Sequence, residues 1–125
     1  MENIKDYVVH IYQIHLSLDR NRVCFMPYDV IMRKYGGVIP AGIYQHVYQA
    51  ECNTEDPEEI FRQYNLYHPA DYRARSLSVS DVVEFEKSPE ERSFYFCDTF
   101  GFRRIDFDRN KVFDPAEANN IPASG

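Results

Sequence analysis

The feature that most constrains the fold of this chain is a series of short segments that are rich in β-branched and aromatic residues. In one of them, Tyr44, His46 and Tyr48 alternate with their neighbours along the chain, which is the period of a half-buried strand. Turn-forming or polar residues separate the segments, so each is expected to be one strand of a sheet. The segments are residues 7–16, 43–52, 77–85, 93–98 and 102–107, the third of them beginning with a turn.

Two short helices are predicted between these strands. Pro27 suits the first position of a helix, and Gly36 suits the position just past its end. The second helix has the clearer start, because Asp56 can cap it, Pro57 follows at the first helical position, and Glu59 completes a capping box. We therefore predict an α+β fold: a mostly antiparallel sheet of about four to five strands with two short helices packed on it.

A single domain accounts for the length and composition of the chain. Its 125 residues are 44% hydrophobic and 15% aromatic, which is sufficient to bury one core. We assign this domain to residues 1–107 and expect residues 108–125 to form a polar, flexible C-terminal tail. The first residues fit neither a signal peptide nor a membrane span, so we expect a cytoplasmic protein that does not insert into membranes.

The net charge of −6 bears on the kind of partner. Proteins that bind DNA or RNA gain affinity from Lys and Arg that displace phosphate counterions, so an acidic balance argues against nonspecific nucleic-acid binding. A local basic patch remains compatible with that balance.

Metal and catalytic sites find little support in the residue pattern. The three cysteines are scattered and lack CxxC spacing. His10 and His15 have odd spacing and point to opposite faces of a strand, while His46 and His68 are isolated in sequence. No phosphate-binding glycine pattern appears either. We therefore predict no metal, no cofactor and no catalytic residue.

Candidate binding residues come from three local features. Tyrosine combines apolar area with a polar tip, so the tyrosine-rich segment 43–52 predicts either a packed core or a binding face. Two arginines before the third strand suit a carboxylate or phosphate, against the plainer interpretation of solvated loop charges. An aromatic pair around a glycine bend predicts a packed corner or a binding loop. The candidates are Tyr44, Tyr48, Arg73, Arg75, Phe100 and Phe102.

Six sequence segments, taken in order, resemble one known family. They are IYQI, FMPYD, IYQHVYQAE, EEIFRQYN with HP after it, RSLSVSDVVEF and FYFCDTFGF. Together they resemble the YodL-like domain over Ile11 to Phe102, and the most specific parts are SLSVSDVV and CDTFGF. The resemblance implies an accessory role in mobile genetic elements such as conjugative elements and phages. It implies no catalytic residues.

Our leading hypothesis is a non-enzymatic protein-interaction module of a mobile element, acting in counter-defence by binding a host protein. A second hypothesis is a nucleic-acid-associated module, in which Arg73, Arg75, Arg103 and Arg104 form a basic edge beside aromatic rings that stack on bases. A third is a small-molecule enzyme whose pocket includes His46, His68 or Asp98, and it requires titratable groups in mutual contact. The oligomeric state is not determined by the sequence.

Overall fold

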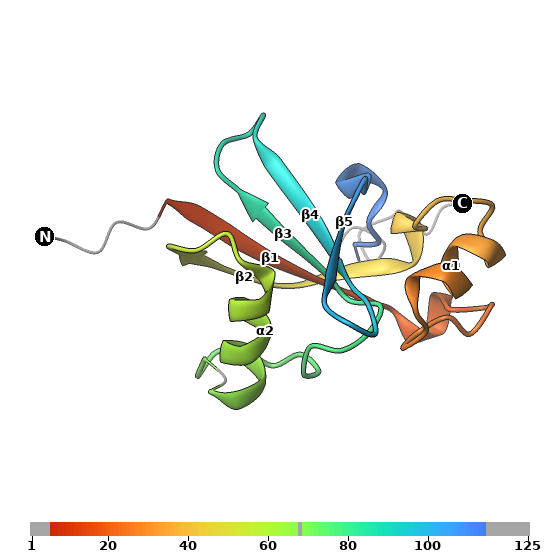
Figure 1. Ribbon diagram of the computed structural model, residues 1–125, viewed down its shortest axis with the longest axis horizontal. Helices are drawn as coiled ribbons and strands as arrows, with labels where there is room; N and C mark the ends of the chain where they lie inside the picture. The colour runs from red at the N-terminus through yellow and green to blue at the C-terminus, as the bar shows by residue number, and fades with distance from the viewer. Residues whose placement is uncertain (1–5, 68, 115–125) are drawn as a thin grey trace, which may run out of the picture.

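The computed structural model describes residues 6–67 and 69–114. Five strands and two α-helices make up this part of the chain, with short 3₁₀ turns between them (Figure 1). In chain order the elements are β1 (Tyr7–Ile14), α1 (Tyr28–Lys34), β2 (Tyr44–Cys52), α2 (Pro57–Leu66), β3 (Val82–Glu86), β4 (Arg92–Cys97) and β5 (Phe102–Ile105).

The strands form one five-stranded sheet in the order β2-β1-β3-β4-β5, and every neighbouring pair is antiparallel. The predicted α+β fold with an antiparallel sheet and two helices is thus confirmed. Strand β1 pairs with β2 on one side and with β3 on the other, although β3 begins almost seventy positions later in the chain. This arrangement places the middle of β1 between two strands, where its side chains are almost completely buried.

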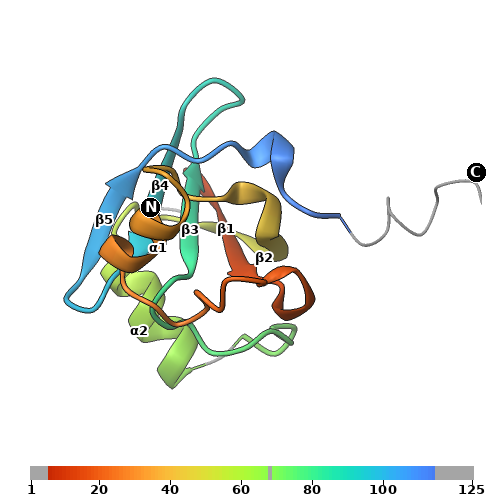
Figure 2. The ribbon, with the colours of Figure 1, turned by 90° about the vertical axis from the view of Figure 1, so that its right-hand side faces the viewer.

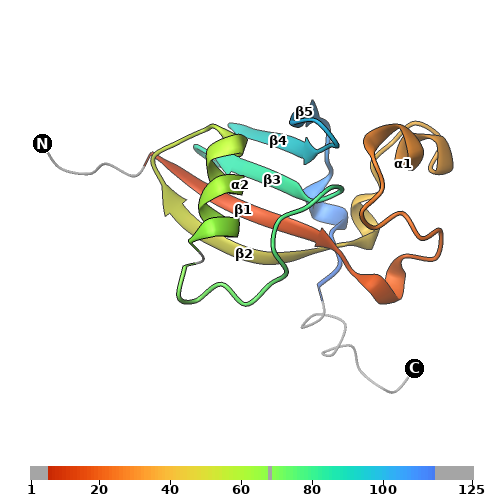
Figure 3. The same ribbon diagram turned by 60° about the horizontal axis from the view of Figure 1, so that its bottom comes forward.

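The two helices cover opposite faces of the sheet (Figures 2 and 3). Helix α2 crosses one face and buries Ile60 and Tyr64 against Val9, Ile11 and their neighbours. Helix α1 lies at one end of the other face, where Ile31 joins a second apolar cluster. Because β-strand side chains alternate between faces, each strand contributes to both clusters.

A β-bulge divides β2 into two parts. Ile11 pairs with Tyr48, but Tyr12 pairs with His46, so Val47 is the extra residue. Such an insertion shifts the alternation by one position. The alternation that the sequence predicted across this strand is therefore wrong past Val47: His46 lies on the face of Tyr12, whereas Tyr48 lies on the face of Ile11.

The helix starts follow the predicted chemistry with two corrections. Asp56 caps α2 by accepting a hydrogen bond from the Glu58 amide at 3.0 Å, and Pro57 is the first helical residue. The backbone amide of Asp56 donates to the Thr54 hydroxyl, which takes the place predicted for the Glu59 side chain. Pro27 precedes α1 as its N-cap and is not its first residue. Within the described residues, neither helix is long enough and apolar enough to cross a membrane.

The segment after β5 turns back over the sheet. Residues Arg109–Lys111 form a 3₁₀ turn, and the Phe113 amide donates to the Tyr44 carbonyl at 2.8 Å. The first part of the predicted C-terminal tail, up to residue 114, thus packs against β2. The remainder, residues 115–125, lies outside the described part of the chain.

Candidate functional site

A polar cluster occupies the half of one sheet face that α1 leaves uncovered. It consists of His10 from β1, His46 from β2, Glu84 and Glu86 from β3, and Arg92 from β4. Strand pairing brings them together, because His10 lies opposite Glu84 and Glu86 lies opposite Arg92. The other half of the same face is apolar and packs against α1.

Glu84 is the buried centre of this cluster. Its carboxylate is fully buried and accepts hydrogen bonds from the Tyr12 hydroxyl and from the Arg92 guanidinium, both at 2.6 Å. The Arg109 guanidinium lies 3.7 Å from it. A buried carboxylate is tolerated when charged and hydrogen-bonded partners surround it, which is the case here.

A chain of hydrogen bonds links Glu86, His10 and His46. His10 Nε2 lies 2.8 Å from the Glu86 carboxylate, and His10 Nδ1 lies 2.9 Å from His46 Nε2. His10 is buried, whereas His46 is solvent-exposed. The three residues therefore connect the polar cluster with the surface.

The electrostatics favour a charged Glu86 and a neutral His46 at neutral pH. The hydrogen bond from His10 lowers the pKa of the Glu86 carboxyl, and the charge of Arg92 adds to this effect. Although His46 is exposed at the surface, partial burial of its ring lowers its pKa, and the neighbouring His10 lowers it further. Burial also raises the pKa of the Tyr12 hydroxyl, with a contribution from its bond to Glu84, so Tyr12 remains a hydrogen-bond donor.

A cavity of about 460 Å³ opens beside this chain. His10, Tyr12 and His46 line it from the sheet, and Arg109 and Asn110 line it from the 3₁₀ turn after β5. Sequence reasoning treated His10 and His46 as separate, since they lie 36 positions apart. The alternation of His10 with the apolar residues of its strand was the one available signal, because it puts a histidine on the Tyr12 face.

Within the described residues, this cluster also gathers side chains of the types that bind metal ions. Ligand atoms of His10, Glu84 and Glu86 all lie within 4.8 Å of one another. Arg92, however, donates to Glu84 and also lies 3.4 Å from Glu86. A divalent ion at this position would have to displace the guanidinium that already neutralises both carboxylates, so the donor set fits a hydrogen-bonded cluster better than a metal centre.

The two candidate tyrosines of β2 lie on opposite faces and do not form one binding surface. Tyr44 is fully buried, and its hydroxyl donates to the Ser80 carbonyl at 2.6 Å. Tyr48 packs edge-on against Tyr64 and Tyr72 beneath α2. Its hydroxyl reaches Asp71 at 2.8 Å.

The other four candidates are distributed over two loops and a strand. Arg73 is exposed and donates to the Ala70 carbonyl, whereas Arg75 is half-buried and donates to the Ile14 carbonyl. Phe102 is half-buried. Phe100, at the turn between β4 and β5, is 96% exposed.

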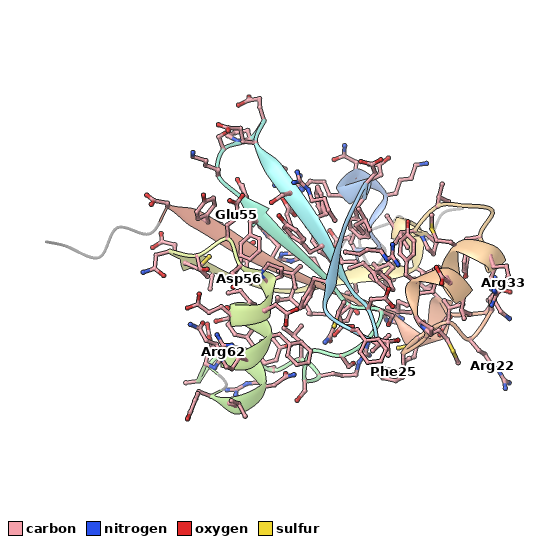
Figure 4. All side chains as sticks on the ribbon, in the orientation of Figure 1. Arg22, Phe25, Arg33, Glu55, Asp56 and Arg62 are labelled. Carbon is pink, nitrogen blue, oxygen red and sulfur yellow. The ribbon has the colours of Figure 1, made fainter. Side chains whose placement is uncertain are left out.

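Sequence reasoning missed two exposed apolar side chains before α1. Phe25 and Met26, in the segment before α1, are both exposed. The Tyr28 amide donates to the Asp98 carboxylate at 3.2 Å, which ties this segment to the β4–β5 turn. Figure 4 shows Phe25 at the lower edge of the molecule, between Arg62 of α2 and Arg22. We call Phe25, Met26 and Phe100 the apolar loop surface.

The structure also shows where most residues of the two alternative hypotheses lie. Arg103 and Arg104 lie on opposite faces of β5, over the rings of Tyr28 and Tyr95 respectively, so they do not form one basic edge. Asp98 accepts hydrogen bonds from the Tyr28 and Thr99 amides and pairs with Arg103. His68 lies outside the described residues.

Comparison with known proteins gives one family. The model of the YodL-like domain matches residues 8–107, which is most of the chain and includes all five strands apart from the first residue of β1. No match was found among curated proteins or among solved structures. The matched range contains the polar cluster and the apolar loop surface, and it ends just before Arg109. The chain belongs to the YodL-like domain family.

Proposed function

We propose that this domain is a protein-interaction module that binds its partner through the apolar loop surface. The observation that carries the proposal is Phe25, which exposes 53% of its surface although its backbone has a φ of +70°. This left-handed conformation costs a bulky L-residue of the order of 1–3 kcal/mol, and such cost recurs at binding sites. An exposed ring gains no core packing in return.

Several contacts hold this strained loop in place. The Phe25 amide donates to the buried Ser80 hydroxyl at 3.0 Å, and Asp19 accepts from the amides of Val23 and Cys24. The Arg75 guanidinium lies over the Phe25 ring, 5.6 Å from its centroid. A preorganised aromatic side chain loses little conformational entropy on binding, which favours affinity.

The charges around the surface indicate the chemistry of the partner. Arg22 and Arg33 are exposed and lie on the α1 side of Phe25 (Figure 4), and Arg103 lies beside Tyr28 at the start of α1. These cations bring positive charge to the surroundings of Phe25, alongside the carboxylates of Asp29 and Asp98. A protein segment with an apolar side chain flanked by carboxylates complements this surface.

The biological setting of the interaction is proposed from the family resemblance. A mobile genetic element benefits from binding a host protein that would otherwise act against it. Counter-defence of this kind needs a binding surface and no catalytic residue at that surface. The partner is therefore proposed to be a host protein.

The test is an affinity purification of the tagged full chain from a nuclease-treated host lysate. Phe100→Asp puts a charge into the apolar loop surface, whereas Leu66→Asp puts the same charge at a leucine that is 64% exposed at the end of α2. We expect one protein to be enriched by the wild type and by Leu66→Asp, and at least tenfold less by Phe100→Asp.

Two results would contradict this proposal. Equal recovery of the partner by both variants would place the interaction elsewhere. Recovery that depends on omitting the nuclease, and that falls steeply with salt, would favour the nucleic-acid alternative.

A further inference from the structure

We propose that the cavity beside His46 is a second, catalytic site, in which His46 accepts a proton from water while that water attacks a small acyl compound. The proposal does not depend on the apolar loop surface. It rests on the hydrogen-bonded chain from Glu86 through His10 to His46, which ends at the cavity.

The hydrogen bonds decide which nitrogen of each histidine carries a proton. A carboxylate only accepts hydrogen bonds, so His10 must donate from Nε2 to Glu86. In a neutral ring the other nitrogen, Nδ1, is then an acceptor, so His46 donates to it from Nε2. The lone pair of His46 is left on Nδ1, and no hydrogen bond within the described residues occupies that atom.

The same hydrogen bonds give a captured proton a place where its charge is stabilised. When His46 Nδ1 takes a proton, its Nε2 proton can pass 2.9 Å to His10 Nδ1. The positive charge then resides on His10, which pairs directly with the Glu86 carboxylate at 2.8 Å. A carboxylate that orients a histidine and stabilises its cation is the arrangement of hydrolytic triads, extended here by one imidazole.

Acyl transfer also produces a negative charge, which needs a cation beside it. Arg109 lines the same cavity, and it is anchored by its contact of 3.7 Å with Glu84. A guanidinium near the attacked carbonyl stabilises the oxyanion of the tetrahedral intermediate. The other charged side chains around these hydrogen bonds are Arg92, Glu84 and Glu86. The two glutamates balance the charges of Arg92 and Arg109, and Asp114 also lines the cavity.

The proposed reaction is hydrolysis of the acyl compound through a tetrahedral intermediate. The water oxygen bonds to the acyl carbon while His46 Nδ1 takes a water proton, and the carbonyl electrons move to the oxygen beside Arg109. The intermediate then expels the leaving group, which recovers a proton from His46 either directly or through solvent. The products are a carboxylic acid and the free leaving group, and the enzyme returns to its starting protonation state.

The test measures the hydrolysis of p-nitrophenyl acetate by the full chain, monitored through the release of p-nitrophenol. His46→Gln removes the base at an exposed position, and His15→Gln removes a histidine that lies outside the chain of hydrogen bonds and contacts Ser17. We expect the wild type and His15→Gln to be equally active, and His46→Gln to be slower by 10²-fold or more, an order-of-magnitude figure for general-base catalysis.

Glu86 and His10 are positioning residues, so their test is the pH profile. The Glu86→Gln variant can still accept a hydrogen bond from His10, but the negative charge is lost. The cationic form of the histidine pair is then less stable, so the midpoint of the rate profile should shift to lower pH by about one unit. A variant that only disturbed packing would lower the rate without moving this midpoint.

Two outcomes overturn the proposal. One is equal activity of His46→Gln and His15→Gln. The other is a wild-type rate no greater than that of the same concentration of free imidazole. Circular dichroism of each variant confirms that loss of rate is not loss of fold. Phe100→Asp should retain the full hydrolysis rate, which separates this site from the proposed interaction surface.

Discussion

At the scale of single residues, Asp81 shows how one buried carboxyl closes a turn and sets a pH dependence. Its Oδ2 accepts from the Ser78 amide at 2.9 Å and from the Gln13 amide group at 3.0 Å. Within the described residues Oδ1 has no hydrogen-bond partner. Burial raises the pKa of this carboxyl to about 7, although both bonds and Arg75 oppose the rise.

The raised pKa of Asp81 predicts that part of the stability is lost as the pH rises. The folded state binds this proton more tightly than the unfolded state, whose carboxyl has a pKa near 3.8. The free energy of unfolding should therefore fall between about pH 4 and pH 7, by about 1.4 kcal/mol for each unit of pKa difference. Asp81→Asn removes this dependence.

Urea denaturation of both proteins across this pH range measures the effect. The free energy of unfolding of the wild type minus that of Asp81→Asn should decrease as the pH rises. Asp29→Asn, at an exposed position on α1, controls for the loss of one carboxylate. A constant difference between wild type and Asp81→Asn would contradict the assignment.

At the scale of elements, the β4–β5 turn joins the sheet to α2 and presents Phe100 to solvent. Gly101 adopts a φ of +85°, as the bend in the sequence predicted. A Cβ at this position would lie 3.1 Å from the Glu58 carboxylate in the first turn of α2. The turn therefore depends on glycine for its conformation and for its contact with the helix.

We predict that Gly101→Ala destabilises the domain by about 1–2 kcal/mol, because an L-residue is strained in the left-handed region. The melting temperature should fall by several degrees. Gly42→Ala is a suitable control, because its Cβ would make only an ordinary contact of 3.8 Å with the Lys111 carbonyl. Equal melting temperatures for the two variants would show that the turn tolerates a side chain.

At the scale of the whole molecule, one sheet separates two apolar clusters. Ile60 of α2 belongs to the cluster on one face, and Ile31 of α1 belongs to the cluster on the other. The polar cluster lies on the same face as α1. The α2 face of the sheet is therefore covered by apolar packing, whereas the α1 face combines apolar packing with charged side chains. Because the two helices pack into separate apolar clusters on opposite faces of the sheet, their packing energies should be independent.

This independence predicts additive effects of mutation. Ile31→Val and Ile60→Val each remove one buried methylene group and should each cost about 0.5–1.5 kcal/mol. The double variant should lose the sum of the two values within about 0.5 kcal/mol. Urea denaturation of the four proteins measures the coupling. A larger deviation would mean that the two faces are linked through the sheet.

Much of the fold was predictable because its signals are local. The start of α2 is set by Asp56 and Pro57 within one turn, and the five strand segments follow from residue type and turn chemistry. The β2 bulge was not predictable, because one extra residue in a strand leaves no mark in a short sequence window. The strained backbone at Phe25 was also hidden, since it is maintained by Ser80, which lies far along the chain.

The sequence by itself determined the class of fold, the family, and the positions of most elements, because these depend on contacts among residues that are close along the chain. Only the tertiary structure decided which side chains meet. His10 meets His46 and Glu86 across distances of 36 and 76 positions, and Tyr44 and Tyr48 separate onto two faces at one bulge. Strand order and register fix such contacts, and they result from burying both faces of the sheet at once.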